Sequence, residues 1–133
     1  MKDDYVDFET AKLLKEKGFD IPCDNYYDSS GKTPNESVYG GANIETLDYN
    51  TDPFIKSGFS KFKTFSAPTQ SMAMKYLREV HKYLIVVGNK NGNYLYLIKD
   101  LKANTDLGIS NNEYIYYEEA VEAAIKYCLT NLI

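Results

Sequence analysis

The sequence is poor in the residues that build common metal and redox sites: it has two cysteines and a single histidine, His81. Cys23 and Cys128 lack the CxxC spacing of a zinc or redox motif, and no secretory leader accompanies them, so we expect two free thiols. One histidine and two distant cysteines do not supply the usual ligands of a zinc ion within one chain. The sequence therefore predicts no metal centre and no cofactor.

Motifs of the common nucleotide-binding and hydrolytic sites are also missing. The glycine pair in YGGAN at residues 39–43 has neither the spacing of a phosphate-binding loop nor a helix after it, and no GxGxxG or GxSxG motif occurs. No apolar run approaches the roughly 18 residues of a membrane span, and the polar N-terminus lacks the apolar core of a leader. We therefore expect a cytoplasmic protein that has no membrane partner.

Positive charge is not concentrated anywhere, whereas tyrosine is abundant. The net charge is −4 and the 15 Lys and Arg residues are dispersed, so nucleic acid is not an expected partner. The chain has 13 tyrosines and no tryptophan. Tyrosine combines a large apolar ring with a hydroxyl group and suits half-buried surfaces, interfaces and stacking sites.

The length of 133 residues predicts one domain, 1–133, which can bury a core without a metal or a disulfide. Asp7 is a suitable N-cap for a first helix with an apolar stripe. Gly18 can adopt the left-handed conformation that ends this helix, and Phe19 can then pack back on Leu14.

Residues 20–66 follow as an irregular insertion that holds three of the four prolines and no sustained period. Short strands are possible around Ser37–Tyr39 and Ser60–Phe65. Such a long irregular stretch is usually a functional loop or an insertion. Its aromatic content indicates order rather than a solvated linker. These aromatic residues are Tyr26, Tyr27, Tyr39, Tyr49, Phe54, Phe59, Phe62 and Phe65.

A second helix and a β-hairpin are predicted next. Thr69 is the expected N-cap, and the helix has one buried face, formed by Met72, Ala73, Tyr76, Leu77 and Val80. Residues 83–87 and 93–98 read as two strands joined by the five residues 88–92, whose Asn-Gly pair favours a hairpin turn. Both faces of the second strand are apolar, so we expect both to be covered at least in part.

Three elements are predicted for the end of the chain. A polar connection, LKANTDLGISNN, is followed by a short strand over residues 113–116 and then by a helix that docks on the sheet. The apolar face of that helix is Tyr117, Ala120, Val121, Ala124, Cys128 and Leu132. The predicted class is α+β: helix, long aromatic insertion with short strands, helix, antiparallel hairpin extended to a small sheet, and a C-terminal helix on one face of the sheet.

The segments FETAKLLKEKGFDIPC, SAPTQSMAMKYLREVH and YYEEAVEAAIKYCLTNLI resemble a widespread group of small uncharacterised proteins from bacteriophages and prophages of gut bacteria, including crAss-like phages. The likeness covers the two ends and the middle helix. Residues 20–66 depart from it, because this stretch is longer and richer in composition than expected between the first two similar segments. It implies a phage or prophage accessory protein that acts in the cytoplasm of the bacterial host. It brings no activity, cofactor or catalytic residue with it.

The candidates for catalysis have structural interpretations. His81 stands at a predicted helix C-terminus, where the dipole favours a cation, and Glu79 is on another side of the helix. Cys23 has no base beside it to lower its pKa. A carboxylate pair for hydrolysis is conceivable at Asp24 and Asp28, but a loop rich in Asp and Tyr is more often a solvated surface.

We therefore expect a binding protein that is not an enzyme. The first hypothesis is that the Tyr-rich insertion contacts a host or phage protein. The second is that its rings stack on a small nucleotide signal of host defence and sequester it, with lysines holding the phosphates. The candidate binding residues are Tyr26, Tyr27, Tyr39, Tyr49, Lys61 and Lys63. A homodimer is a further possibility, because a hairpin edge and surplus tyrosines favour pairing.

Overall fold

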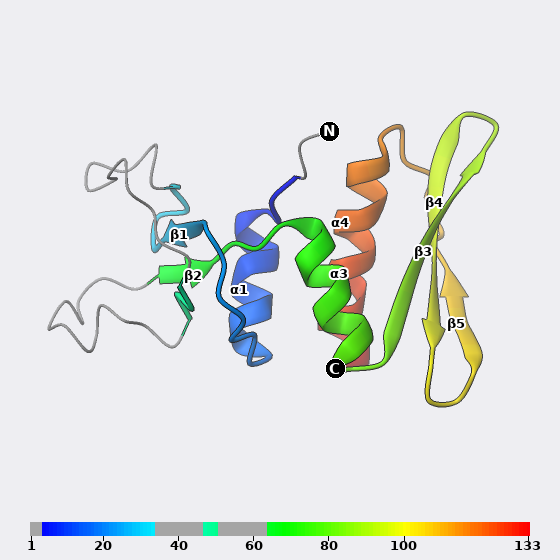
Figure 1. The fold of residues 1–133 in the computed structure, drawn as a ribbon. Helices are drawn as coiled ribbons and strands as arrows, with labels where there is room; N and C mark the ends of the chain where they lie inside the picture. Colours follow the sequence, from blue (N-terminus) through cyan, green and yellow to red (C-terminus); the bar gives the residue numbers. More distant parts are fainter. Residues whose placement is uncertain (1–3, 34–46, 51–63) are drawn as a thin grey trace, which may run out of the picture. The chain divides into compact units, whose positions relative to one another are not determined.

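The computed structural model describes residues 4–33, 47–50 and 64–133 (Figure 1). Within them it holds three α-helices and two antiparallel sheets, of two and three strands, which confirms the α+β class. The contacts divide the chain into two compact units, described separately below. The N-terminal unit is Tyr5–Pro68, and the C-terminal unit is Thr69–Ile133 with Met1–Asp4.

The N-terminal unit begins with α1 (Phe8–Glu16), and both of its ends were predicted. The Asp7 carboxylate accepts a hydrogen bond from the backbone N–H of Thr10 at 2.9 Å, as an N-cap does. Gly18 has a φ of +86° and the N–H of Phe19 donates to the carbonyl of Leu14 at 2.9 Å. This is the Schellman ending that the glycine predicts.

The two strands of this unit are β1 (Tyr26–Asp28), which was not predicted, and β2 (Thr64–Ser66), at the end of the stretch predicted as 60–65. The other predicted strand, 37–39, lies outside the described residues. Side-chain hydrogen bonds fix residues 47–50 against β2, because Ser66 Oγ accepts from the N–H of Tyr49 at 2.9 Å and Asn50 Oδ1 accepts from the N–H of Ser66 at 2.8 Å.

The C-terminal unit begins with α3 (Gln70–Glu79), capped as predicted by Thr69, whose hydroxyl accepts from the N–H of Met72 at 3.2 Å. Its buried side chains are Gln70, Ala73, Tyr76 and Leu77. Val80 was expected in this face but is 57% exposed, because it is the C-cap residue at which the chain leaves the helix.

The predicted hairpin is present, with longer strands and a tighter turn. β3 (Tyr83–Lys90) pairs with β4 (Asn93–Asp100) so that Lys90 lies opposite Asn93. Only Asn91 and Gly92 form the turn, and their φ angles of 54° and 87° are those of a type I′ turn. The five-residue connection predicted from 88 to 92 is therefore wrong, since the strands continue up to the Asn-Gly pair.

The third strand is not where the sequence placed it. β5 (Thr105–Ile109) lies in the stretch predicted to be a polar connection, and it pairs with β4. The strand predicted over 113–116 is reduced to one bridge, in which the backbones of Tyr94 and Tyr114 exchange two hydrogen bonds of 2.7 Å. All five residues of β5 are exposed, and its two apolar residues, Leu107 and Ile109, are too short a pattern to predict this edge strand.

The last helix, α4 (Tyr117–Tyr127), continues into a π-helical turn, η1 (Cys128–Leu132). Ala120, Val121, Ala124 and Cys128 are buried as predicted. The expected burial of Tyr117 and Leu132 is wrong: Tyr117 is exposed at the first turn of α4, and Leu132 is half-buried at the end of the π-turn. Ile125 and Leu129 are buried as well.

Figure 1 shows α3 and α4 on one face of the three-stranded sheet. The helix α3 packs on β3, and α4 packs on both β3 and β4. The predicted docking of the C-terminal helix on the sheet is therefore confirmed. Among the helices of the described residues, none has both the length and the apolar character that crossing a bilayer requires.

Candidate functional site

The tyrosines predicted to bind a partner take part in the packing of the N-terminal unit wherever they are described. Tyr49 is only 2% exposed, and its ring centroid lies 4.5 Å from that of Tyr26. Burial, and then the charge of Asp28, raise the pKa of Tyr26, so its hydroxyl stays protonated at neutral pH. Because Tyr49 is almost fully buried and packed against Tyr26, its ring has almost no surface left to offer a partner.

Tyr27 is also engaged inside this unit. Its hydroxyl donates to the carbonyl of Val6 at 2.7 Å, and its ring lies 5.5 Å from that of Phe8. Phe8 makes an edge contact with Phe65 as well, at 5.6 Å. The remaining predicted binding residues, Tyr39, Lys61 and Lys63, lie outside the described residues. Partner binding by the insertion therefore stays a prediction.

The aspartates considered for hydrolysis bind groups of their own unit. Asp28 Oδ1 accepts hydrogen bonds from the N–H and hydroxyl of Ser30, at 2.9 and 2.6 Å, and from the N–H of Lys32 at 3.0 Å. This carboxylate therefore closes the turn that follows β1. Asp24 Oδ1 accepts from the hydroxyl of Tyr5 at 3.1 Å.

His81 lies just after α3, as predicted, with its Nε2 3.0 Å from the hydroxyl of Tyr76. Burial, and then the charge of Lys102, lower the pKa of His81. The environment therefore favours the neutral imidazole over the cation that a helix C-terminus would favour. The ring of His81 also makes an edge contact with the ring of Tyr76, with centroids 5.1 Å apart.

Cys23 and Cys128 are both free, as the sequence predicts, and both are buried. Burial raises the pKa of the Cys23 thiol and raises the pKa of Cys128 to about 12. Neither thiol is a nucleophile at neutral pH, because the thiolate is the reactive form. Across the part of the chain that the structure describes, no three His, Cys, Asp or Glu residues gather as metal ligands.

The sheet of the C-terminal unit has an apolar face turned away from its helices. Tyr96 and Ile98 of β4 are buried, so the alternating residue Leu97 points to the other side. Leu97 lies opposite Val86 of β3 and Ile109 of β5, and these three side chains form a row across the sheet. Val86 is 41% and Ile109 63% exposed.

We call this surface the outer face and define it as Leu84, Val86, Leu95, Leu97 and Ile109. An antiparallel sheet commonly has polar residues on the face that is not covered by helices. Here an ion pair of 3.9 Å between Lys99 and Asp106, on neighbouring strands, adjoins the apolar residues. An apolar centre with charged residues beside it is the usual composition of a protein interface.

A cavity of about 320 Å³ lies beside β5, on the helix-facing side of the sheet. It forms because α3 and α4 pack over β3 and β4, whereas β5 extends past this helix layer. After β5 the chain remains paired at Ser110, whose N–H donates to the carbonyl of Tyr96 at 2.9 Å. It then leaves the sheet and returns at Tyr114, and Asn111 and Asn112 between these points line the cavity.

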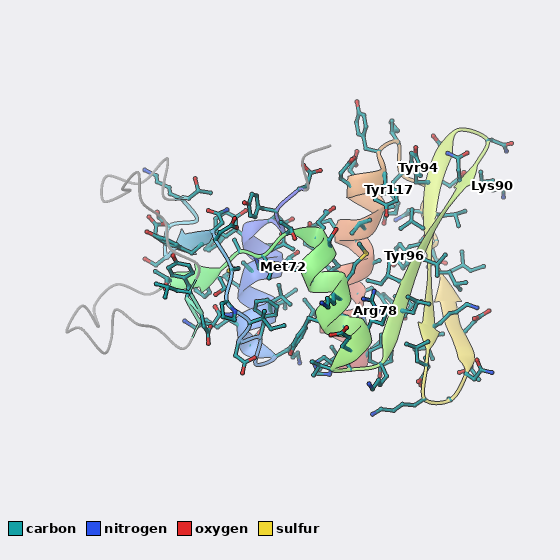
Figure 2. The ribbon with its side chains drawn as sticks, viewed as in Figure 1. Met72, Arg78, Lys90, Tyr94, Tyr96 and Tyr117 are labelled. Carbon is teal, nitrogen blue, oxygen red and sulfur yellow. The ribbon has the colours of Figure 1, made fainter. Side chains whose placement is uncertain are left out.

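Three tyrosine rings and several uncharged polar groups surround the cavity. The rings of Tyr96 and Tyr114 are stacked with centroids 6.5 Å apart, and the ring of Tyr127 lies 6.3 Å from that of Tyr96. Figure 2 shows Tyr96 between β4 and α4. Ser110 and Asn112 also line the cavity, and none of its ten lining residues is charged.

The hydroxyl groups of these tyrosines are available to a ligand. Burial, and then the neighbouring Tyr114 and Tyr127, raise the pKa of Tyr96. Among the described residues, no side chain or backbone group forms a hydrogen bond with the hydroxyl of Tyr96, Tyr114 or Tyr127. They can therefore act as donors or acceptors toward a bound molecule.

Sequence reasoning missed both the outer face and the cavity. The apolar side chains of the hairpin predicted that both faces of the sheet require cover, but Ile109 was not recognised as part of a strand. The cavity joins residues from β4, β5 and α4, which are up to 31 positions apart between Tyr96 and Tyr127. The high tyrosine content was the one feature that pointed to it.

Comparison of the chain with protein-family models, with curated proteins and with solved structures finds no match.

Proposed function

We propose that this protein is not an enzyme and acts by binding another protein through the outer face of its sheet. The observation that carries the proposal is the row formed by Val86, Leu97 and Ile109, which leaves apolar side chains in water on the face opposite the helices. Transferring such a row from water to an apolar partner surface is favourable, and contiguous apolar patches commonly mark interaction sites.

The partner expected for this surface has a complementary apolar patch. The resemblance to phage and prophage proteins suggests a host or phage protein in the bacterial cytoplasm, where such a contact would serve an accessory or anti-defence role. A second copy of this chain has the same apolar chemistry and is the alternative occupant. The insertion, which the sequence favoured as the interface, is a separate proposal that rests on tyrosine content.

Sequestration of a small nucleotide has less support. The cavity beside β5 offers aromatic rings, but no Lys or Arg is among its lining residues. A nucleotide phosphate buried there would lack a counter-charge, and an unpaired buried charge is costly. The two lysines assigned to phosphate binding, Lys61 and Lys63, lie outside the described residues.

The proposal is tested by placing a charge on the outer face with Val86→Lys. Val80→Lys is the matched control, since Val80 is exposed at the end of α3 and is not part of the outer face. Tagged wild-type, V86K and V80K chains are used to capture proteins from a bacterial lysate, and circular dichroism verifies their folding. We expect capture by the wild type and V80K and at least about a tenfold loss with V86K.

Light scattering of the same three chains tests whether a second copy of this chain occupies the outer face. A dimer that V86K dissociates and V80K does not would assign the outer face to self-association. A partner retained equally by V86K and V80K, or no partner and no dimer for the wild type, would contradict the proposal.

A further inference from the structure

We propose that the cavity beside β5 is a binding site for an uncharged sugar, a mono- or disaccharide. This site shares Ile109 with the outer face. Its tyrosines Tyr96 and Tyr127 lie on the helix-facing side of the sheet, whereas Val86 and Leu97 of the proposed protein interface lie on the other side. Its volume of about 320 Å³ falls in the range of small-molecule sites.

The first argument is the absence of charge among the lining residues. A charged ligand in a partly enclosed site needs an opposite charge or several strong hydrogen bonds to replace its hydration. The ten residues around this cavity include no Asp, Glu, Lys, Arg or His. They therefore favour a neutral ligand over a phosphate, a carboxylate or an amine.

The second argument is the kind of polar group present. Tyr96, Tyr114 and Tyr127 supply three hydroxyl groups, and Asn111 and Asn112 supply amide groups that can both donate and accept. A ligand that satisfies such a mixed set must itself carry several groups that donate and accept. Sugar hydroxyls do so, and the tyrosine rings supply apolar surface for the C–H face of a sugar ring.

The third argument is the distance between the aromatic rings. A flat nucleobase held between two parallel rings requires about 7 Å, because each contact takes roughly 3.5 Å. The centroids of Tyr96 and Tyr114 are 6.5 Å apart with an interplanar angle of 27°, so no base fits between them. A ligand can use only the outer edges and faces of these rings, which suits a sugar better than an intercalated base.

The site is tested by titrating the full chain, labelled with ¹⁵N, with glucose, galactose, mannose, N-acetylglucosamine, maltose and lactose, and separately with adenosine and uridine. The amides of Gly108 and Ser110, both in the cavity wall, report binding at the site. For a ligand of this size we expect saturable shifts at these amides with a Kd on the order of 1 mM.

The variant Tyr127→Ala removes one ring from the cavity wall, and Tyr116→Ala is the control, since Tyr116 is 63% exposed and does not line the cavity. We expect Y127A to raise the Kd by about tenfold or more and Y116A to leave it unchanged. Tyr127→Phe keeps the ring and removes only the hydroxyl, so a smaller loss is expected.

Three results would overturn the proposal: no saturable shift with any sugar, binding of the nucleosides alone, or sugar binding that Y127A does not weaken. V86K should bind sugar as the wild type does. This separates the two proposals, since either surface can fail its test while the other passes.

Discussion

At the scale of single residues, the neighbours in space decide chemistry that the sequence leaves open. His81 follows a helix, where a positive charge would be favoured, yet partial burial, and then the charge of Lys102, lower its pKa. Asp28 is one of the loop acids that suggested hydrolysis, yet it closes a turn through three hydrogen bonds. In both cases the tertiary contact determines what the side chain can do.

The pKa of His81 gives a direct test. We expect a value below the 6.5 of a free histidine, because burial disfavours the charged ring. The unfolded chain then binds a proton more readily than the folded chain just below pH 6.5. The contribution of His81 to stability is complete above pH 6.5 and is lost as pH falls toward the lower pKa of the folded state.

Because His81 is the only histidine, its ring resonances can be followed by NMR without ambiguity. The unfolding free energy should also lose part of its pH dependence below 6.5 in a His81→Gln variant. A measured pKa at or above 6.5 would contradict the burial argument.

At the scale of elements, helices with defined ends and regular apolar spacing were predicted well. Asp7, Gly18 and Thr69 have the roles that their residue types indicate, because capping depends on residues within one turn of each other. The edge strand β5 was missed, because its place in the sheet depends on pairing with β4 and not on a local pattern. Its two apolar residues, Leu107 and Ile109, are too few to predict a strand.

The N-cap of α3 provides a prediction at this scale. Thr69→Ala removes the hydrogen bond to the N–H of Met72 and should lower the free energy of unfolding by about 1 kcal/mol. Thr69→Ser keeps a hydroxyl at the same place and serves as the control. Urea unfolding followed by circular dichroism measures both variants, and equal losses for Ala and Ser would show that the hydroxyl is not the cause.

At the scale of the whole molecule, the described residues form two units, each with its own core. Leu14 and Phe19 are buried in the N-terminal unit, and Leu77, Ile98 and Ile125 are buried in the C-terminal unit. The hydrophobic contribution to stability is therefore divided between two sets of contacts. A substitution in one core is expected to act first on its own unit.

Hydrogen exchange can test this division with Leu14→Ala and Ile125→Ala, each of which removes a fully buried side chain. Such truncations cost about 2–5 kcal/mol. L14A should speed exchange in α1 and β2 while α4 remains protected, and I125A should do the reverse. A uniform increase over the whole chain in both variants would mean that the two cores unfold as one.

The sequence by itself determined the α+β class, the three described helices, the capping residues and the hairpin with its Asn-Gly turn. These features follow from spacing and from the conformational preferences of residues close together in the chain. Only the tertiary structure decided that Tyr49 is part of a core, that Val86 and Ile109 share an apolar row, and that Tyr96, Tyr114 and Tyr127 meet around a cavity. The physical reason is that these depend on strand pairing and helix packing between distant segments, which no local pattern encodes.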